Sequence, residues 1–266
     1  MGAPPLPREH GAYSQLLLPL VVAWALASPT LAALGFTAAA LAVFLAHEPL
    51  LIALGQRGPR AGRLRGRAAQ GWLAVWTLTA LAGIAVAASR ADGATIVSIA
   101  LPALLGAVAS LLILRGAERT LAGELVIAGF LPALAFPVMM AQGVGLRAAG
   151  AAWVAWTLAG IGATAAVRAM IAHLKAPVGW SRRLALPFIS WGTMGFVELA
   201  HAPHASLARA AVPVLLVASV VAAWPPHPRH LKKVGWLLLA ASAATGLWLL
   251  ALLDTHQVAG TISSSL

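Results

Sequence analysis

Long apolar runs, separated by short polar breaks, follow one another along the whole chain. A helix needs about twenty apolar residues to cross the hydrocarbon of a bilayer. Runs of roughly this kind lie at 11–28, 30–54, 69–89, 94–114, 120–141, 148–172, 184–200, 209–224 and 235–254. Clusters of Pro, Gly and charge, such as "GQRGPRAGRLRGR" and "PPHPRHLKK", mark the breaks. The pattern predicts an all-α fold, a polytopic transmembrane bundle of about nine helices in a single integral membrane domain over 1–266.

Composition excludes a soluble alternative. Hydrophobic residues make up 61% of the 266 residues and charged residues only 9%, against roughly 25% charged residues in soluble domains. The chain has no cysteine, which excludes disulfides, thiolate metal sites and a cysteine nucleophile. The first apolar run is followed by further runs and not by a polar mature domain, so we expect it to be retained and not cleaved as a signal peptide.

The net charge of +11 is distributed unevenly between alternate loops. With the N-terminus in the cytoplasm, 15 of the 18 Lys and Arg residues fall on the inner side, and only Arg90, Arg147 and Arg209 fall outside. This bias predicts a cytoplasmic N-terminus and an outer C-terminus. The bias also accounts for the positive net charge, so a nucleic-acid partner is not needed to explain it. The chain offers no soluble surface that could recognise bases.

Three ionisable groups stand directly before the first apolar run, in "REHGAYSQLLLPL". Glu9 suits the positive end of a helix, and Arg8 is an ordinary orientation signal. His10 lies deepest of the three and shares a helical face with Ser14. Because ionisable groups at membrane depth are functional by default, we expect a site role for His10 together with Glu9.

His47 and Glu48 interrupt a second apolar run, in "FLAHEPLLIALG". Pro49 follows directly and can kink a helix at this point. A carboxylate at this depth must find a cation or become protonated. The residues therefore indicate either a salt bridge that pins two helices or a polar cavity with Glu48 as acid, base or ligand, and the latter is favoured.

Further ionisable groups lie on the same predicted side. Glu124 follows the "RGAER" loop, where Arg115 and Glu118 suggest an exposed pair, and Pro132 with Pro137 predicts a bend further along. Arg168 could form an ion pair with Glu124, or its long side chain could snorkel to the inner head groups. Lys175 shares a helix face with Arg168, whereas His173 does not. These groups predict one inward-facing polar pocket, with Glu48, His10, His47 and Glu124 as catalytic candidates and Arg168, Arg8 and Lys175 as anion-binding candidates.

Two pairs of histidines have a spacing of three, in "HAPH" (His201, His204) and "HPRH" (His227, His230). Both pairs fall in Pro-rich loops, on opposite predicted sides of the membrane and without a third ligand. We therefore predict no metal site. The sequence identifies no cofactor.

"PREHGAYSQLLLPL", "FLAHEPLLIAL" and the Arg-rich loop that leads into "GW" resemble the YwiC-like family of bacterial membrane proteins. That family begins with a similar E-H-G-A-aromatic stretch and has a comparable E-P in its second helix. The resemblance covers about the first 75 residues and implies a multi-pass protein of the bacterial inner membrane. By resemblance, its motif residues are Glu9, His10, Gly11, Glu48 and Pro49.

The helix layout is also distantly similar to that of UbiA-type prenyltransferases, which have nine helices with polar motifs at the cytoplasmic ends of the second and sixth. In this chain the corresponding positions are occupied by His47 and Glu48 on the second helix and by Arg168 and His173 on the sixth. The superfamily uses two Asp-rich motifs to hold Mg²⁺, which demands several oxygen ligands. Only one carboxylate stands at the first place and none at the second, so the similarity does not imply Mg-dependent prenyl transfer.

Together these features predict a protein that binds or modifies an anionic lipid-like or isoprenoid molecule in a cytoplasm-facing pocket. Two alternatives stay open at this level. A secondary transporter would need polar groups on the far side, where Glu198 and Asp254 are the candidates. An assembly factor for a membrane complex would need none of these residues as a small-molecule site.

Overall fold

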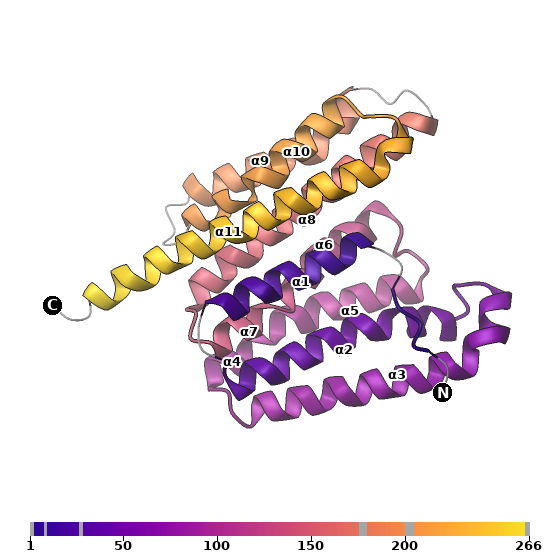
Figure 1. The fold of residues 1–266 in the computed structure, drawn as a ribbon, viewed down its shortest axis with the longest axis horizontal. Helices are drawn as coiled ribbons and strands as arrows, with labels where there is room; N and C mark the ends of the chain where they lie inside the picture. The colour runs from indigo at the N-terminus through magenta and orange to yellow at the C-terminus, as the bar shows by residue number, and fades with distance from the viewer. Residues whose placement is uncertain (1–2, 8–9, 27–28, 176–179, 200–204, 264–266) are drawn as a thin grey trace. The chain divides into compact units, whose positions relative to one another are not determined.

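The structure is a computed structural model, and it describes residues 3–7, 10–26, 29–175, 180–199 and 205–263. At residues 10, 199, 205 and 228, and at 173–175, 180–183 and 254–263, it describes the backbone alone. In all of these residues the regular structure is helical, with no strand (Figure 1). This confirms the all-α expectation, which follows from the need to satisfy every backbone polar group inside hydrocarbon.

Each predicted run corresponds to one helix or to two consecutive helices. The elements are α1 (His10–Ala25), α2 (Leu31–Ala53), α3 (Pro59–Ala88), α4 (Gly93–Ser98), α5 (Ala100–Leu114), α6 (Leu121–Ala133), α7 (Phe136–Ala141), α8 (Leu146–Lys175), α9 (Trp180–Leu199), η1 (Ala205–Ala211), α10 (Val212–Ala223), η2 (Pro228–His230) and α11 (Leu231–Ser263). Among the described residues, seven helical segments are long and apolar enough to cross a membrane. The chain is therefore a multi-pass membrane protein. The helices outside that group are α1 and α9.

The helices of residues 27–143 form one compact unit together with residues 1–13. Its tightest contact is between α2 and α3, where Gly35 and Gly83 face each other. A Cβ on Gly35 would lie 2.5 Å from the Gly83 carbonyl oxygen, and a Cβ on Gly83 would lie 2.5 Å from the Gly35 carbonyl oxygen. Only glycine allows two backbones to approach so closely, as small residues do between membrane helices.

Helices in this unit are broken where the sequence provides proline or a cap. The run predicted at 120–141 divides into α6 and α7 around Leu134 and Ala135, between Pro132 and Pro137, which confirms the predicted bend. The run at 94–114 divides into α4 and α5 at Ile99, which the pattern did not predict. Pro49, in contrast, lies inside a helix that continues to Ala53.

The second unit comprises residues 14–26 and 144–266. Its core is built on α8 and α10, where Gly162 lies against the side chains of Leu215 and Ala218. The Trp191 indole on α9 donates a 3.0 Å hydrogen bond to Ser219 Oγ on α10. Trp191 therefore packs between helices, as its place in the middle of a predicted span suggested.

Candidate functional site

A buried carboxylate lies near the C-terminal end of α2. Glu48 is 2% exposed, and its carboxylate accepts hydrogen bonds from the guanidinium of Arg57. Arg57 Nε lies 3.1 Å from both carboxylate oxygens, and Nη2 lies 2.6 Å from Oε2. Charge-assisted hydrogen bonds of this forked kind are the strong ones in proteins. The cation that Glu48 requires is thus supplied by the loop directly after its own helix.

The end of α2 folds back in a way that brings Arg57 to Glu48. Gly55 has a φ of 73°, its N–H bonds the Ile52 carbonyl, and the Gln56 N–H bonds the Leu51 carbonyl. This pair of bonds around a left-handed glycine is the Schellman motif, which ends a helix and reverses the chain. Gly58, with a φ of 86°, then starts α3. Arg57 lies between these two glycines.

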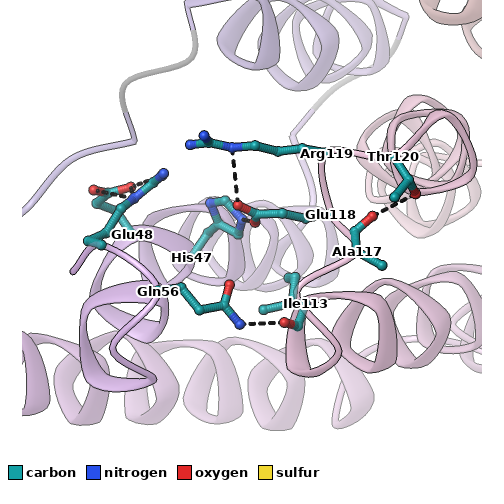
Figure 2. A network of polar contacts seen from close by, with 9 residues as sticks. His47, Glu48, Gln56, Ile113, Ala117, Glu118, Arg119 and Thr120 are labelled. Carbon is teal, nitrogen blue, oxygen red and sulfur yellow. Dashed lines mark hydrogen bonds and ion pairs between the residues drawn. The ribbon is translucent and has the colours of Figure 1, made fainter.

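The neighbouring imidazole, His47, contacts a different acid. His47 Nε2 lies 3.5 Å from Oε2 of Glu118, and Arg119 Nε lies 3.7 Å from Oε1 of the same carboxylate (Figure 2). Glu118 is 14% exposed, whereas Arg119 is 74% exposed. The Glu118 side chain therefore lies between a sheltered imidazole and a solvent-facing guanidinium.

The loop that carries Glu118 is held firmly in place. Thr120 Oγ1 donates to the Ala117 carbonyl at 2.7 Å (Figure 2). It also accepts the Gly123 N–H at 3.2 Å, which caps α6. A Cβ on Gly123 would lie 2.5 Å from the carbonyl oxygens of both Ala117 and Glu118. This glycine is required for the loop to pack against its own helix.

The two loops are also joined to each other. The Gln56 side-chain amide donates to the Ile113 carbonyl at the end of α5 (Figure 2). Helix α5 ends in the same way as α2, with Gly116 at a φ of 65° and the Ala117 N–H on the Leu112 carbonyl. The ends of α2 and α5 therefore lie together, and the polar groups gather there.

The start of α1 also reaches this part of α2. The Tyr13 ring meets the Phe44 ring edge-on, with centroids 4.8 Å apart, and its hydroxyl donates to the Pro7 carbonyl at 3.0 Å. Phe44 lies one turn before Glu48 on α2. The structure thus brings Tyr13, in the first turn of α1, close to Phe44 on α2, although the two residues are far apart in the sequence.

The remaining candidates are placed less closely. Glu124 is partly buried in the first turn of α6, where a negative charge is favourable. Arg168 is partly buried on α8, in the second unit. Pro49 is buried and Gly11 is exposed. Arg8 and Glu9 lie outside the described residues, and so do the side chains of His10, His173, Lys175 and Asp254.

Sequence reasoning was wrong about one pair and missed another. Glu118 was expected to pair with Arg115, but it contacts His47 and Arg119. Arg57 was not predicted as the partner of Glu48, since a separation of nine residues fits no helical face. The signal lay in Gly55 and Gly58, which mark a chain reversal on either side of Arg57.

Glu198 on α9, the acid that the sequence predicted to lie outside, forms an ion pair with Arg209. Arg209 Nε lies 2.8 Å from Glu198 Oε1, and the Arg209 side chain is 57% exposed. In "HPRH", Arg229 connects the two histidines, with its N–H on His227 Nδ1 and its Nε on His230 Nε2, each at 3.2 Å. Desolvation and the nearby Arg229 and Lys233 charges lower the pKa of His230. Among the described residues no group of three metal-ligating side chains occurs.

The fold and this network define a polytopic helical membrane protein with a buried ionic centre at one end of its first unit. Residues 6–140, about half of the chain, match the model of a family described as YwiC-like protein, and the chain belongs to that family. The matched residues contain Glu48, Arg57, Glu118 and Tyr13. Comparisons with curated proteins and with solved structures found no match.

Proposed function

We propose that this protein binds or modifies an anionic lipid-like or isoprenoid molecule at the polar centre around Glu48. The observation that carries the proposal is the forked Glu48–Arg57 pair beside the His47–Glu118 contact. Charged groups in membrane-depth sequence are expensive, and they mark binding and reaction sites more often than inert positions. An ion pair that only fastens a loop to its helix would not need a second polar contact, between an imidazole and a carboxylate, at the adjacent residue.

The chemistry of the centre suits an anion with an apolar tail. A guanidinium fork that holds a carboxylate has the geometry to hold a phosphate as well. If Arg57 turns to such a ligand, the Glu48 carboxylate loses the cation that it contacts in this structure.

Several other residues belong to the proposal as expectations from the sequence. His10 and Glu124 would complete the acid–base groups, and Arg8 would add positive charge for the anion. Arg168 and Lys175 belong to the second unit and stay expectations from the sequence. The Tyr13–Phe44 contact supports the place of His10, since it brings the first turn of α1 close to the Glu48 turn of α2.

Native mass spectrometry of the detergent-purified chain tests the proposal. We expect the wild type to retain an anionic lipid or isoprenoid and Arg57→Gln to lose it while the chain still inserts. Arg209→Gln is the matched control, because it removes the same charge from an exposed ion pair. Retention by Arg57→Gln equal to that of the wild type contradicts the proposal.

One observation favours a transporter as the second candidate. The chain forms two compact units of similar size, and many secondary transporters are built from two such halves. Proteoliposomes that contain only this protein would distinguish the candidates. Uptake or efflux of a solute would favour the transporter, whereas a bound lipid without transport favours the first proposal.

A further inference from the structure

The first three turns of α3 carry a dense set of arginines that the polar centre does not use. Arg60, Arg63, Arg65 and Arg67 are all exposed, and none of them pairs with another described residue. No acidic residue occurs between Glu48 and Asp92. Arg57, from the loop before the helix, is the one guanidinium of this stretch that Glu48 engages.

Helix length places this arginine-rich segment, residues 59–67, outside the hydrocarbon. Helix α3 has 30 residues and is therefore about 45 Å long at about 1.5 Å per residue. The hydrocarbon core is only about 30 Å thick, so about ten residues project from it. In Figure 1 the first turns of α3 turn away from the axis of the long remainder of the helix.

A pair of indoles marks where the helix enters the membrane. Trp72 and Trp76 stack with centroids 5.5 Å apart, and Trp is enriched at the level of the lipid head groups. Arg67 comes five residues before Trp72, on the water side. Within the segment, Arg60, Arg63 and Arg67 share one helical face, and Leu64, which is 74% exposed, lies beside them.

We infer that residues 59–67 form a docking surface for anionic phospholipid head groups of the adjacent leaflet. Arginine donors meet lipid phosphates, and the exposed Leu64 enters the boundary between head groups and acyl chains, as in amphipathic interfacial helices. Basic residues next to a transmembrane helix attract anionic lipids electrostatically. This surface is distinct from the Glu48 centre and does not depend on the ligand proposed there.

Electron paramagnetic resonance of spin-labelled phosphatidylglycerol and phosphatidylcholine, with the full chain reconstituted in vesicles, tests the inference. We expect the wild type to prefer phosphatidylglycerol. The triple substitution Arg60→Gln, Arg63→Gln and Arg67→Gln should lower that preference about threefold. Replacement of the same three residues by Lys should retain the preference, because the charge is kept.

The matched control removes three positive charges that are spread over separate loops, by Arg90→Gln, Arg115→Gln and Arg147→Gln. These residues are exposed and lie at different helix ends. An equal loss in this control shows that net charge alone decides the preference and overturns the inference, as does an unchanged preference in the Arg60, Arg63 and Arg67 variant. The wild-type preference must also fall with rising salt, a requirement that holds even if a variant does not fold.

Discussion

The ring of Tyr13 meets the ring of Phe44 edge-on, with centroids 4.8 Å apart. This contact joins the two stretches that carry the YwiC-like resemblance, since Tyr13 is the aromatic residue of "EHGAY" and Phe44 lies one turn before Glu48. Edge-to-face pairs contribute about 0.5–1.5 kcal/mol beyond the burial of their surface. Tyr13, in the first turn of α1, is thus held beside α2 by an aromatic contact.

Tyr13 therefore allows a test of how the two stretches are joined. Tyr13→Phe keeps the ring contact and loses only the hydrogen bond to Pro7, so we expect a loss of about 1 kcal/mol in the free energy of unfolding. Tyr13→Ala loses both and should cost about 3 kcal/mol. Unfolding in mixed detergent micelles measures both values. Equal losses in the two variants would show that the ring contact contributes nothing.

The Glu48–Arg57 pair predicts that its two single substitutions lower the free energy of unfolding by different amounts. Arg57→Gln leaves the carboxylate of Glu48 buried without its cation and should lower the free energy of unfolding by about 3 kcal/mol. Glu48→Gln should cost less, since Arg57 is more exposed, with 16% of its side chain accessible against 3% for Glu48.

The double variant Glu48→Gln with Arg57→Gln should recover most of the stability lost by Arg57→Gln. The coupling energy from this cycle measures the pair directly. Strictly additive effects of the two substitutions would mean that the two side chains do not interact in the folded protein.

The close approach of α2 and α3 predicts a strong effect of one methyl group. Gly83→Ala would place its Cβ 2.5 Å from the Gly35 carbonyl oxygen and 3.0 Å from the Ala39 nitrogen, so the helices must separate. We expect a loss of about 1–3 kcal/mol in the free energy of unfolding.

Gly62→Ala is the matched control on the same helix, because nothing lies within 4 Å of the new methyl group. Alanine at an open helical position should stabilise the helix by about 0.5–1 kcal/mol. If both substitutions had the same effect on unfolding, the packing at Gly83 would be looser than the structure indicates.

Asp92 predicts a dependence on pH at the start of α4. Its carboxylate accepts the Thr95 N–H at 2.7 Å, and hydrogen bonds from the Thr95 side chain and backbone lower the pKa of Asp92. Because the folded pKa is depressed, the cap stabilises the helix end at pH values above 3.8, and this stabilisation is lost as the pH falls through the lower folded value.

Hydrogen exchange of the Thr95 amide measures this effect. Asp92→Ala should exchange faster than the wild type near neutral pH, and the difference should shrink in acid as the wild-type carboxyl is protonated. A difference that stays constant across the acid range would show that the charge of Asp92 does not support the cap.

Much of the fold could be predicted because hydrophobic runs and breaks are local properties of the sequence. The helix α2, for instance, was expected at 30–54 and is observed at Leu31–Ala53. The division at Ile99 was not predicted, although Pro102 marks it: proline has no N–H to bond the Ser98 carbonyl four residues earlier. In the part of the chain that the structure describes, seven segments have the length and composition of membrane spans, whereas the orientation rests on the distribution of Lys and Arg.

The site was only partly predictable, because pairing between side chains depends on how the chain reverses at each helix end. Glu48 could be identified from its position within an apolar run of the sequence. The identity of its partner, in contrast, depends on the turn made by Gly55. His47 on α2 and Glu118 in the loop before α6 are 71 residues apart in sequence, and they come within 3.5 Å because the ends of α2 and α5 lie together. The Glu48–Arg57 pair has a local signal in Gly55 and Gly58, whereas the His47–Glu118 contact has none.

Whether the Glu48–Arg57 pair serves a ligand as well as the fold can be measured on the double variant in which both become Gln. This variant removes the two charges together, so its stability stays near that of the wild type while the binding groups are lost. Native mass spectrometry should find an anionic lipid or isoprenoid on the wild type and none on the double variant. Equal occupancy in both proteins, or a wild type that carries no such molecule, would contradict a ligand role for the pair.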